Sequence, residues 1–307
     1  MKRRRNRMKF QAKGILPAMI TPFTKEGKLN EKVLRKLINY LIKGGVHGIF
    51  AVATTGEFYG LSNEEYRQAL EITKDEVAGR LPVYAGANHI TTRGSIALAQ
   101  IAEDVGVDAL SVLTPMFISP NQDQVYEHFA AIAKSTSLPV LLYNNRPKTN
   151  VDITPETVAR LADIPNIVGV KDSTGDMTNS GEYIRLTRGK DFSVLMGRDT
   201  LIHAGLCYGA TGAVAACANV APRLCSSIYD KYVQGDIKGS LEAQYRLAPL
   251  RIAFGLGTFP AVIKEGLELL GIEAGPCFAP VGPLKTEERE QLKKILTEMG
   301  LFQEDAS

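Results

Sequence analysis

The chain has 307 residues, of which 45% are hydrophobic and 22% charged, and its formal net charge is +3. A chain of this length can bury a large core, and α/β barrels of this size are often one domain. Six basic residues stand within the first nine positions, and removing their charges leaves −3, which gives no electrostatic case for nucleic-acid binding. No stretch reaches eighteen consecutive apolar residues, so no membrane span is expected.

Residues 1–13 are expected to form a basic, disordered leader. No apolar run follows it, so it does not have the pattern of a secretory signal. The four cysteines include no C-x-x-C pair and the four histidines are scattered singly, so no residues have metal-ligand spacing. Reduced structural thiols of this kind fit the cytoplasm, which is the predicted location.

A short apolar run followed by an amphipathic stretch recurs along most of the sequence. Apolar runs of this length are typical of strands that are buried on both faces. Eight strands are predicted, at Gly14–Ile20, Gly48–Ala53, Pro82–Gly86, Ala109–Leu113, Pro139–Tyr143, Ile167–Val170, Phe192–Met196 and Gly212–Ala215. Helices are predicted among them, at Glu31–Lys43, Asn63–Ala78, Thr92–Val105, Gln122–Ser135, Thr154–Ala162 and Asn179–Thr187.

Strands that alternate with helices indicate parallel crossovers, and eight of them indicate an α/β fold closed into a (β/α)₈ TIM barrel. A doubly wound open sheet is the alternative, but it usually carries a G-x-G-x-x-G turn, which this sequence lacks. Four further helices are predicted at Pro222–Gln234, Leu241–Ala253, Phe259–Leu270 and Thr286–Met299. We therefore expect one structural unit, with the barrel over residues 14–221 and a C-terminal helical extension over residues 222–307.

One lysine, Lys171, stands at the end of the sixth predicted strand, within Asn166–Thr174. An ammonium group beside a buried strand is poorly hydrated, and desolvation favours the neutral amine. A neutral amine is a nucleophile that can form a Schiff base with a ketone. From this stretch alone, the alternative is a lysine that extends its charge into water at a strand end.

Polar residues follow other strands as well, at the carboxyl ends where the active site of such a barrel lies. After the second strand, the hydroxyls of Thr54 and Thr55 and the N–H groups of a glycine turn could hold a carboxylate, with a simple capped turn as the alternative. After the sixth and seventh strands, Ser173, Gly197 and Asp199 are further candidates for binding a substrate. A glycine at such a point lets a substrate approach the backbone.

Tyr143 ends the fifth strand, and its phenol could shuttle a proton. The alternative is an amphipathic tyrosine at the barrel mouth whose hydroxyl has a hydrogen-bond partner but no part in catalysis. Arg146 and Lys148 follow it closely and could bind an anion.

Taken together, these residues resemble the dihydrodipicolinate synthase / N-acetylneuraminate lyase family of class I aldolases. The similarity begins at Gly14 and covers nearly the whole chain after the basic residues. Its motifs are T-P-F at Thr21–Phe23, T-T-G-E at Thr54–Glu57, Tyr143-Asn144, G-V-K-D at Gly169–Asp172, Met196-Gly197-x-Asp199 and Gly209–Ala213.

The resemblance implies a lyase in which Lys171 attacks the ketone of pyruvate or another 2-oxo acid. Thr54 and Thr55 would hold the carboxylate, Thr55 would also hydrogen-bond Tyr143, and Tyr143 would relay protons. Glu57 would bond the N–H groups of its own turn. The protonated imine is the electron sink, so neither a metal nor an organic cofactor is expected. The resemblance also implies a homotetramer built as a pair of dimers.

The chain departs from the synthases of this family at two places. Their fourth strand ends in a tyrosine pair, whose second member serves the proton relay of the neighbouring subunit, whereas this chain has Met116 and Phe117. Phe117 has no hydroxyl and cannot pass a proton. The synthases also place an arginine five residues after the strand-five tyrosine to bind the carboxylate of the aldehyde, and here that residue is Lys148, a point charge without the planar guanidinium.

These departures favour a lyase, aldolase or dehydratase that acts on a 2-oxo acid such as a 2-keto-3-deoxy sugar acid. Dihydrodipicolinate synthase, which condenses pyruvate with aspartate semialdehyde, is the alternative. A barrel that serves only as a binding module is expected to lack the nucleophile, whereas this sequence has Lys171. A metal-dependent aldolase would need a histidine-carboxylate cluster, for which the sequence offers no candidate.

Overall fold

The structure is a computed structural model that describes residues 10–302 of the chain. Its strands are β1 (Gly14–Pro17), β2 (Ile49–Ala51), β3 (Val83–Gly86), β4 (Ala109–Leu113), β5 (Val140–Asn144), β6 (Ile167–Asp172), β7 (Ser193–Met196) and β8 (Gly212–Ala215). They pair in parallel in the order β1-β8-β7-β6-β5-β4-β3-β2. A single parallel bridge between Ala18 and Phe50 joins the ends of the sheet, so the predicted barrel is confirmed as a nearly closed ring.

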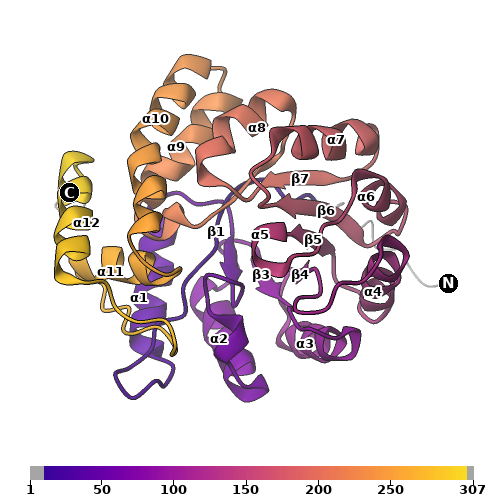
Figure 1. Ribbon diagram of the computed structural model, residues 1–307, viewed down its shortest axis with the longest axis horizontal. Helices are drawn as coiled ribbons and strands as arrows, with labels where there is room; N and C mark the ends of the chain where they lie inside the picture. Colours follow the sequence, from indigo (N-terminus) through magenta and orange to yellow (C-terminus); the bar gives the residue numbers. More distant parts are fainter. Residues whose placement is uncertain (1–9, 303–307) are drawn as a thin grey trace.

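Helices surround this ring (Figure 1). Those that follow the strands in sequence are α1 (Glu31–Lys43), α2 (Asn63–Val77), α3 (Thr92–Val105), α4 (Gln122–Lys134), α5 (Arg146–Thr149), α6 (Pro155–Leu161), α7 (Met177–Thr187) and α8 (Ile202–Tyr208). Helices α5 and α8 were not predicted from the sequence; α5 has only four residues, and α8 has Gly205 in its interior and no side-chain cap at its N-terminus. Without a cap or a long apolar period, so short a helix has no clear sequence signal.

The remaining helices are α9 (Pro222–Val233), α10 (Ile237–Ala253), α11 (Ala261–Leu269) and α12 (Thr286–Glu298). Helix α9 contacts β1, α10 packs along α9, and α12 packs on α10 and α11 at the outer edge of the molecule (Figure 1). In the part of the chain that the structure describes, no single helix is long and apolar enough to cross a membrane, although α10 and α11 pass that test together as a pair bent by 120°.

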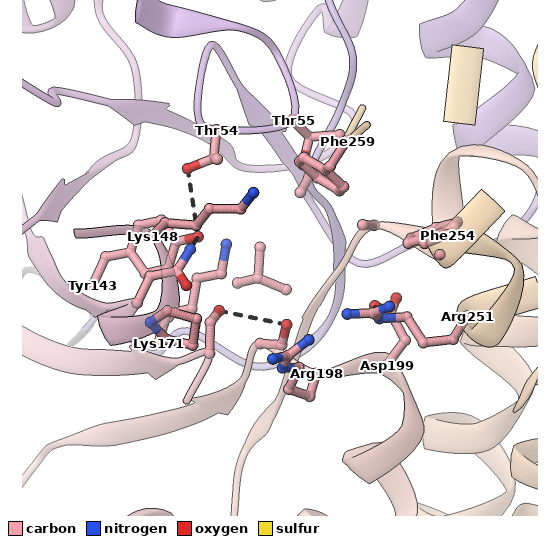
Figure 2. A pocket seen from close by; sticks show the side chains of 18 residues that line it. Thr54, Thr55, Tyr143, Lys148, Lys171, Arg198, Asp199, Arg251, Phe254 and Phe259 are labelled. Atoms are coloured by element: carbon pink, nitrogen blue, oxygen red, sulfur yellow. Dashed lines mark hydrogen bonds and ion pairs between the residues drawn. The ribbon is translucent and has the colours of Figure 1, made fainter. Parts of the chain in front are cut away.

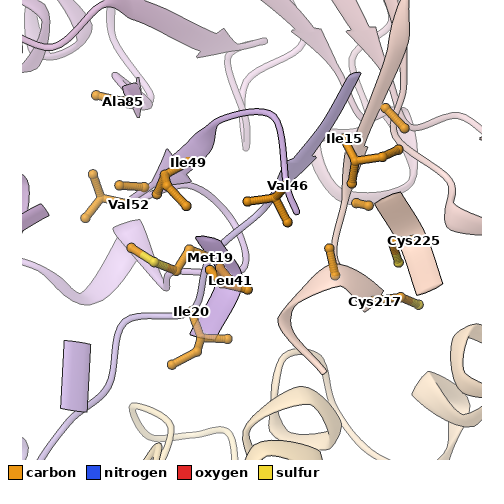
Figure 3. Close-up of a cluster of buried hydrophobic side chains, with 14 of the residues drawn as sticks. Ile15, Met19, Ile20, Leu41, Val46, Ile49, Val52, Ala85, Cys217 and Cys225 are labelled. Carbon is orange, nitrogen blue, oxygen red and sulfur yellow. The ribbon is translucent and has the colours of Figure 1, made fainter. Parts of the chain in front are cut away.

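The barrel has two apolar layers. Inside the ring, Leu16, Phe50, Tyr84, Leu141 and Leu195 belong to one buried cluster. Outside it, a larger cluster lies between the strands and the helices, and Figure 3 shows the part around β1, β2 and α1. The inner cluster fills the barrel interior, so the polar side chains at the carboxyl ends of the strands lie next to apolar residues.

Residues 10–13, which the sequence assigned to the leader, pack on the barrel. The ring of Phe10 lies 5.6 Å from that of Tyr84, and the carbonyl of the fully buried Ala12 accepts a hydrogen bond of 2.8 Å from Thr211 Oγ1. The rest of the predicted leader, residues 1–9, lies outside the described residues.

Candidate active site

A cavity of about 300 Å³ opens at the carboxyl ends of the strands (Figure 2). The structure brings together in its lining all but one of the residues predicted from the sequence: Thr54, Thr55, Tyr143, Lys148, Lys171, Ser173, Gly197 and Asp199. The exception is Arg146, which is exposed and lines a neighbouring cleft with Asp152 and Asp176. The prediction that Arg146 belongs to the substrate site is therefore not supported by its position.

Lys171 occupies the fifth position of β6, directly beside Tyr143 of β5 in the parallel register. Its side chain is 4% exposed, and its Nζ lies 3.9 Å from the centre of the Tyr143 ring and 5.3 Å from that of Phe50. Among the described residues, no carboxylate lies within ion-pair distance of this amine. An amine that is buried among aromatic faces without a counter-ion, and that faces a cavity, is placed to act as a nucleophile.

The phenol of Tyr143 is the hydrogen-bonding centre of the site. It accepts a bond of 3.5 Å from Thr54 Oγ1 and one of 2.8 Å from Asn145 Nδ2. Thr54, rather than the expected Thr55, thus makes the bond to Tyr143. Burial would raise the pKa of the phenol, but the charge of Lys171 and the hydrogen bonds of Thr54 and Ser173 outweigh burial, so the pKa lies below its ordinary value. A phenol with a lowered pKa gives up its proton more readily to a reacting group.

The turn that carries Thr54 and Thr55 has an unusual backbone. Val52 and Glu57, on either side of it, have φ angles of 45° and 56°. Such left-handed conformations cost on the order of 1–3 kcal/mol each in residues other than glycine, and a β-branched valine adopts them rarely. Contacts from elsewhere must hold this turn in place, and one is a 2.8 Å bond from Thr21 Oγ1 to the carbonyl of Gly56.

Glu57 does not bond the N–H groups of its own turn, contrary to the expectation from the sequence. Its Oε2 accepts a 2.7 Å bond from the N–H group of Phe278, and its Oε1 lies 2.6 Å from Lys264 Nζ on α11. Both side chains are buried. The turn after β2 is therefore tied to the C-terminal helices.

Gly197 and Ser173 bring the ends of β6 and β7 close together. Ser173 Oγ lies 3.4 Å from the carbonyl oxygen of Gly197, and a Cβ atom at position 197 would lie only 2.0 Å from that hydroxyl. The glycine is therefore required for this close approach to Ser173, and the expected approach of a substrate to its backbone stays a prediction.

Asp199 is held inside the protein. Its Oδ1 accepts a 2.8 Å bond from the N–H group of Cys217, and its Oδ2 lies 3.4 Å from Arg251 Nε. Burial raises the pKa of this carboxyl, although the Cys217 bond and the Arg251 charge work against that change. Asp199 thus holds Arg251 at the wall of the cavity, and because Asp199 also lines that cavity, its expected contact with the substrate stays a prediction.

Two arginines that sequence reasoning did not select, Arg198 and Arg251, line the cavity (Figure 2). Burial and the neighbouring charge of Arg251 lower the pKa of the Arg198 guanidinium. Lys148 adds a third positive charge at the exposed mouth, with its Nζ 5.9 Å from the centre of the Phe259 ring. Arg198 precedes Asp199 in a predicted motif, but Arg251 lies on α10, where no motif marks it.

The sequence matches the Dihydrodipicolinate synthetase family over residues 11–299. The chain belongs to this family. A 4-hydroxy-tetrahydrodipicolinate synthase of Methanothrix thermoacetophila is 40% identical to it, over 94% of this chain and 97% of the relative. This agrees with the resemblance drawn from the motifs.

Solved structures of the Dihydrodipicolinate synthetase family have the same fold. The dihydrodipicolinate synthase of Thermotoga maritima superposes with a TM-score of 0.92 at 31% identity, covering 95% of this chain and 100% of that one. A second structure is that of YagE from E. coli, a prophage protein of the dihydrodipicolinic acid synthase family in complex with pyruvate. It superposes with a TM-score of 0.91 at 32% identity, covering 94% of this chain and 99% of that one. As a member of this family, the protein is an enzyme of the class I, Schiff-base lyase type.

Proposed function

We propose that this enzyme condenses pyruvate with aspartate semialdehyde, as a 4-hydroxy-tetrahydrodipicolinate synthase, and that Lys171 is its Schiff-base residue. The observation that carries the first half of this proposal is the buried Nζ of Lys171, 3.9 Å from the Tyr143 ring and facing the cavity. The names of the curated relatives support the second half.

In the first half-reaction, the amine of Lys171, once it has given up its proton, adds to the C2 carbonyl of pyruvate. The carbinolamine then loses water to give a protonated imine, and loss of a proton from C3 gives the enamine. Tyr143 would give the proton that the leaving hydroxyl needs and would take one back, and its 3.5 Å contact with Thr54 Oγ1 supports this role. The hydroxyls and N–H groups of the turn at Thr54 and Thr55 would hold the pyruvate carboxylate.

The charge of the cavity supports an acidic second substrate. Of the described residues that line it, Lys148, Arg198 and Arg251 are cationic beside Lys171, whereas Asp199 alone is a carboxylate. Partly buried guanidinium groups that outnumber carboxylates favour an anionic ligand. The sequence predicted that, with Lys148 in place of an arginine, the carboxylate of the aldehyde would have no planar guanidinium to bind. However, the guanidinium groups of Arg198 and Arg251 line the same cavity. This is our reason to place the synthase before the lyase that acts on a neutral-tailed sugar acid.

The lyase or dehydratase that the sequence favoured remains the second candidate, because of Phe117. This residue lacks the relay hydroxyl, its φ angle is 73°, and it is 93% exposed. Cleavage or dehydration of a hydroxylated 2-oxo acid would need no acid-tailed aldehyde and no relay at this position.

Two measurements test the proposal. The protein is incubated with pyruvate and reduced with borohydride, and the tryptic peptides are weighed; the adduct is expected on Lys171, and an adduct elsewhere or none at all would contradict the Schiff-base assignment. Steady-state rates are then compared for aspartate semialdehyde and for a panel of hydroxylated 2-oxo acids. A kcat/KM of about 10⁴ M⁻¹s⁻¹ or more for the semialdehyde supports the synthase, and turnover confined to the hydroxylated acids supports the lyase.

We further propose that the enzyme is a cytoplasmic homotetramer. In each subunit, the barrel and the C-terminal helices, up to residue 302, would form one structural unit. The exposed apolar side chains of Ile90, Phe117 and Ile118 support a subunit contact at that face. Light scattering should give four chains per particle at micromolar concentration, and a monomer would contradict this assembly.

A further inference from the structure

The turn that carries Thr54 and Thr55 is bracketed by two non-glycine residues in left-handed conformations, Val52 at φ 45° and Glu57 at φ 56°. Such conformations persist only where the surrounding structure determines them. Within the turn itself the backbone bonds are few, from Glu57 N–H to the Thr54 carbonyl and from Phe58 N–H to the Ala53 carbonyl. Besides the bond from Thr21 Oγ1 to the carbonyl of Gly56, the far end is fixed by the side chain of Glu57, whose partners lie more than two hundred positions away in the sequence.

These distant bonds form one buried cluster around the Glu57 carboxylate. Lys264 Nζ on α11 lies 2.6 Å from Glu57 Oε1 and donates a 2.7 Å bond to the carbonyl of Pro276. The N–H group of Phe278 donates to Glu57 Oε2 at 2.7 Å. The amine also stands 4.2 Å from the centre of the Phe23 ring. Lys264 therefore joins the turn to both α11 and the segment that follows it.

The 274–278 segment has little freedom to move away from this cluster. The N–H group of Phe23 donates a 3.1 Å bond to the carbonyl of Ala274, and a Cβ atom at Gly275 would lie 1.8 Å from the carbonyl oxygen of Phe23. The rings of Phe23 and Phe278 are 4.3 Å apart. The anchor for Glu57 is thus a rigid part of the C-terminal extension.

We propose that Lys264 is a positioning residue of the active site: its ion pair with Glu57 holds the Thr54–Thr55 turn in the strained conformation that binds the substrate carboxylate. A buried ion pair is weak evidence for a contribution to stability, since apolar residues of similar size often replace one without loss. Here the ion pair fixes the position of Glu57 at the end of a strained turn. An apolar contact is not directional and could not hold the carboxylate in one position.

The inference rests on the proposed function in one respect, that Thr54 and Thr55 hold the carboxylate of pyruvate. It is tested in the full-length enzyme by trapping the Lys171 imine with borohydride over a range of pyruvate concentrations. This yields the half-saturating pyruvate concentration and, separately, the rate at saturation. The single variant Lys264→Met leaves the buried carboxylate of Glu57 unpaired and could fail to fold for that reason. The double variant Glu57→Gln/Lys264→Met buries no unpaired charge and is made as well. If the single variant does not fold, the double variant decides the test.

The matched control is Arg289→Met, which breaks the Arg289–Glu265 ion pair between α12 and α11 without touching the turn. A misplaced turn should raise the half-saturating pyruvate concentration about tenfold to a hundredfold in the Lys264 variants, with the rate at saturation within about threefold of wild type. The control should match wild type in both quantities.

Two results would overturn the inference alone, given a wild-type enzyme that forms the adduct. One is wild-type pyruvate saturation in the folded variants, and the other is an equal rise in Arg289→Met, which would show a general loosening of the C-terminal helices. A wild-type protein that forms no adduct at all would overturn the proposed function, and this inference with it.

Discussion

Replacing Arg251 by methionine tests whether the cavity selects an acid-tailed aldehyde. The Arg251 side chain is 23% exposed and lies on the cavity wall, so its contact with a carboxylate would be largely shielded from water. A charge-assisted hydrogen bond of this kind contributes about 1.5–3 kcal/mol, which corresponds to a loss of about 10- to 150-fold in kcat/KM for aspartate semialdehyde. Arg251→Lys keeps the charge without the plane of the guanidinium and should lose less.

The assay must separate this effect from a second one, because Arg251 also lies 3.4 Å from the buried Asp199. Any disturbance that travels through Asp199 should slow all second substrates alike. Rates are therefore measured with aspartate semialdehyde and with a neutral aldehyde of similar length, both at saturating pyruvate, and Arg246→Met on the exposed side of α10 serves as the control. Equal losses with both aldehydes would refute the reasoning that Arg251 binds the carboxylate.

Three further predictions concern the chemistry and the stability of the enzyme. Lys171→Ala should abolish the borohydride adduct and lower activity by orders of magnitude with an unchanged circular dichroism spectrum, since it removes the nucleophile; residual trapping on another lysine would contradict this. Tyr143→Phe should slow imine formation about 10²- to 10⁴-fold, measured as the time course of trapping, and an unchanged time course would remove Tyr143 from the relay. Burial lowers the pKa of His128 from 6.5 to about 4, so neutral His128 contributes stability above pH 6.5 that is lost as the pH falls towards 4. The free energy of unfolding should drop by about 3 kcal/mol over this window, and His128→Asn should remove that part of the pH dependence, which urea titrations at several pH values would show.

The barrel could be predicted because its signals are local. Each apolar run that the sequence marked as a strand became one, since a parallel strand buried on both faces needs no partner to be recognised. Lys171 and Tyr143 could be placed together for the same reason. Each is the last residue but one of its strand, the two strands are neighbours, and the carboxyl ends of parallel strands meet at one end of the ring.

The contacts of Glu57 and Asp199 could not be predicted, because each depends on a segment far away in the sequence. Both carboxylates were assigned from their own motifs, yet Lys264 and Phe278 bind the first, and Arg251 faces the second. Lys264 and Arg251 lie in helices that the sequence assigned to the C-terminal extension, and Phe278 lies in the segment between α11 and α12. Hydrophobic periodicity predicts that such a helix packs against the barrel, but it does not say which polar residue reaches the site.

The two parts of the chain therefore contribute different things to the reaction. The strand ends carry the amine and the phenol, and these residues fix the class of chemistry. The C-terminal helices carry Arg251, which lines the same cavity, and Lys264, which pairs with Glu57 at the end of the Thr54–Thr55 turn. Exchanging the strand-end residues should abolish the chemistry, whereas exchanging residues of α10 should change which aldehyde is accepted. It follows that family membership and strand-end motifs are sufficient to assign a Schiff-base lyase, and that the choice between synthase and sugar-acid lyase has to be decided at Arg251 and its neighbours.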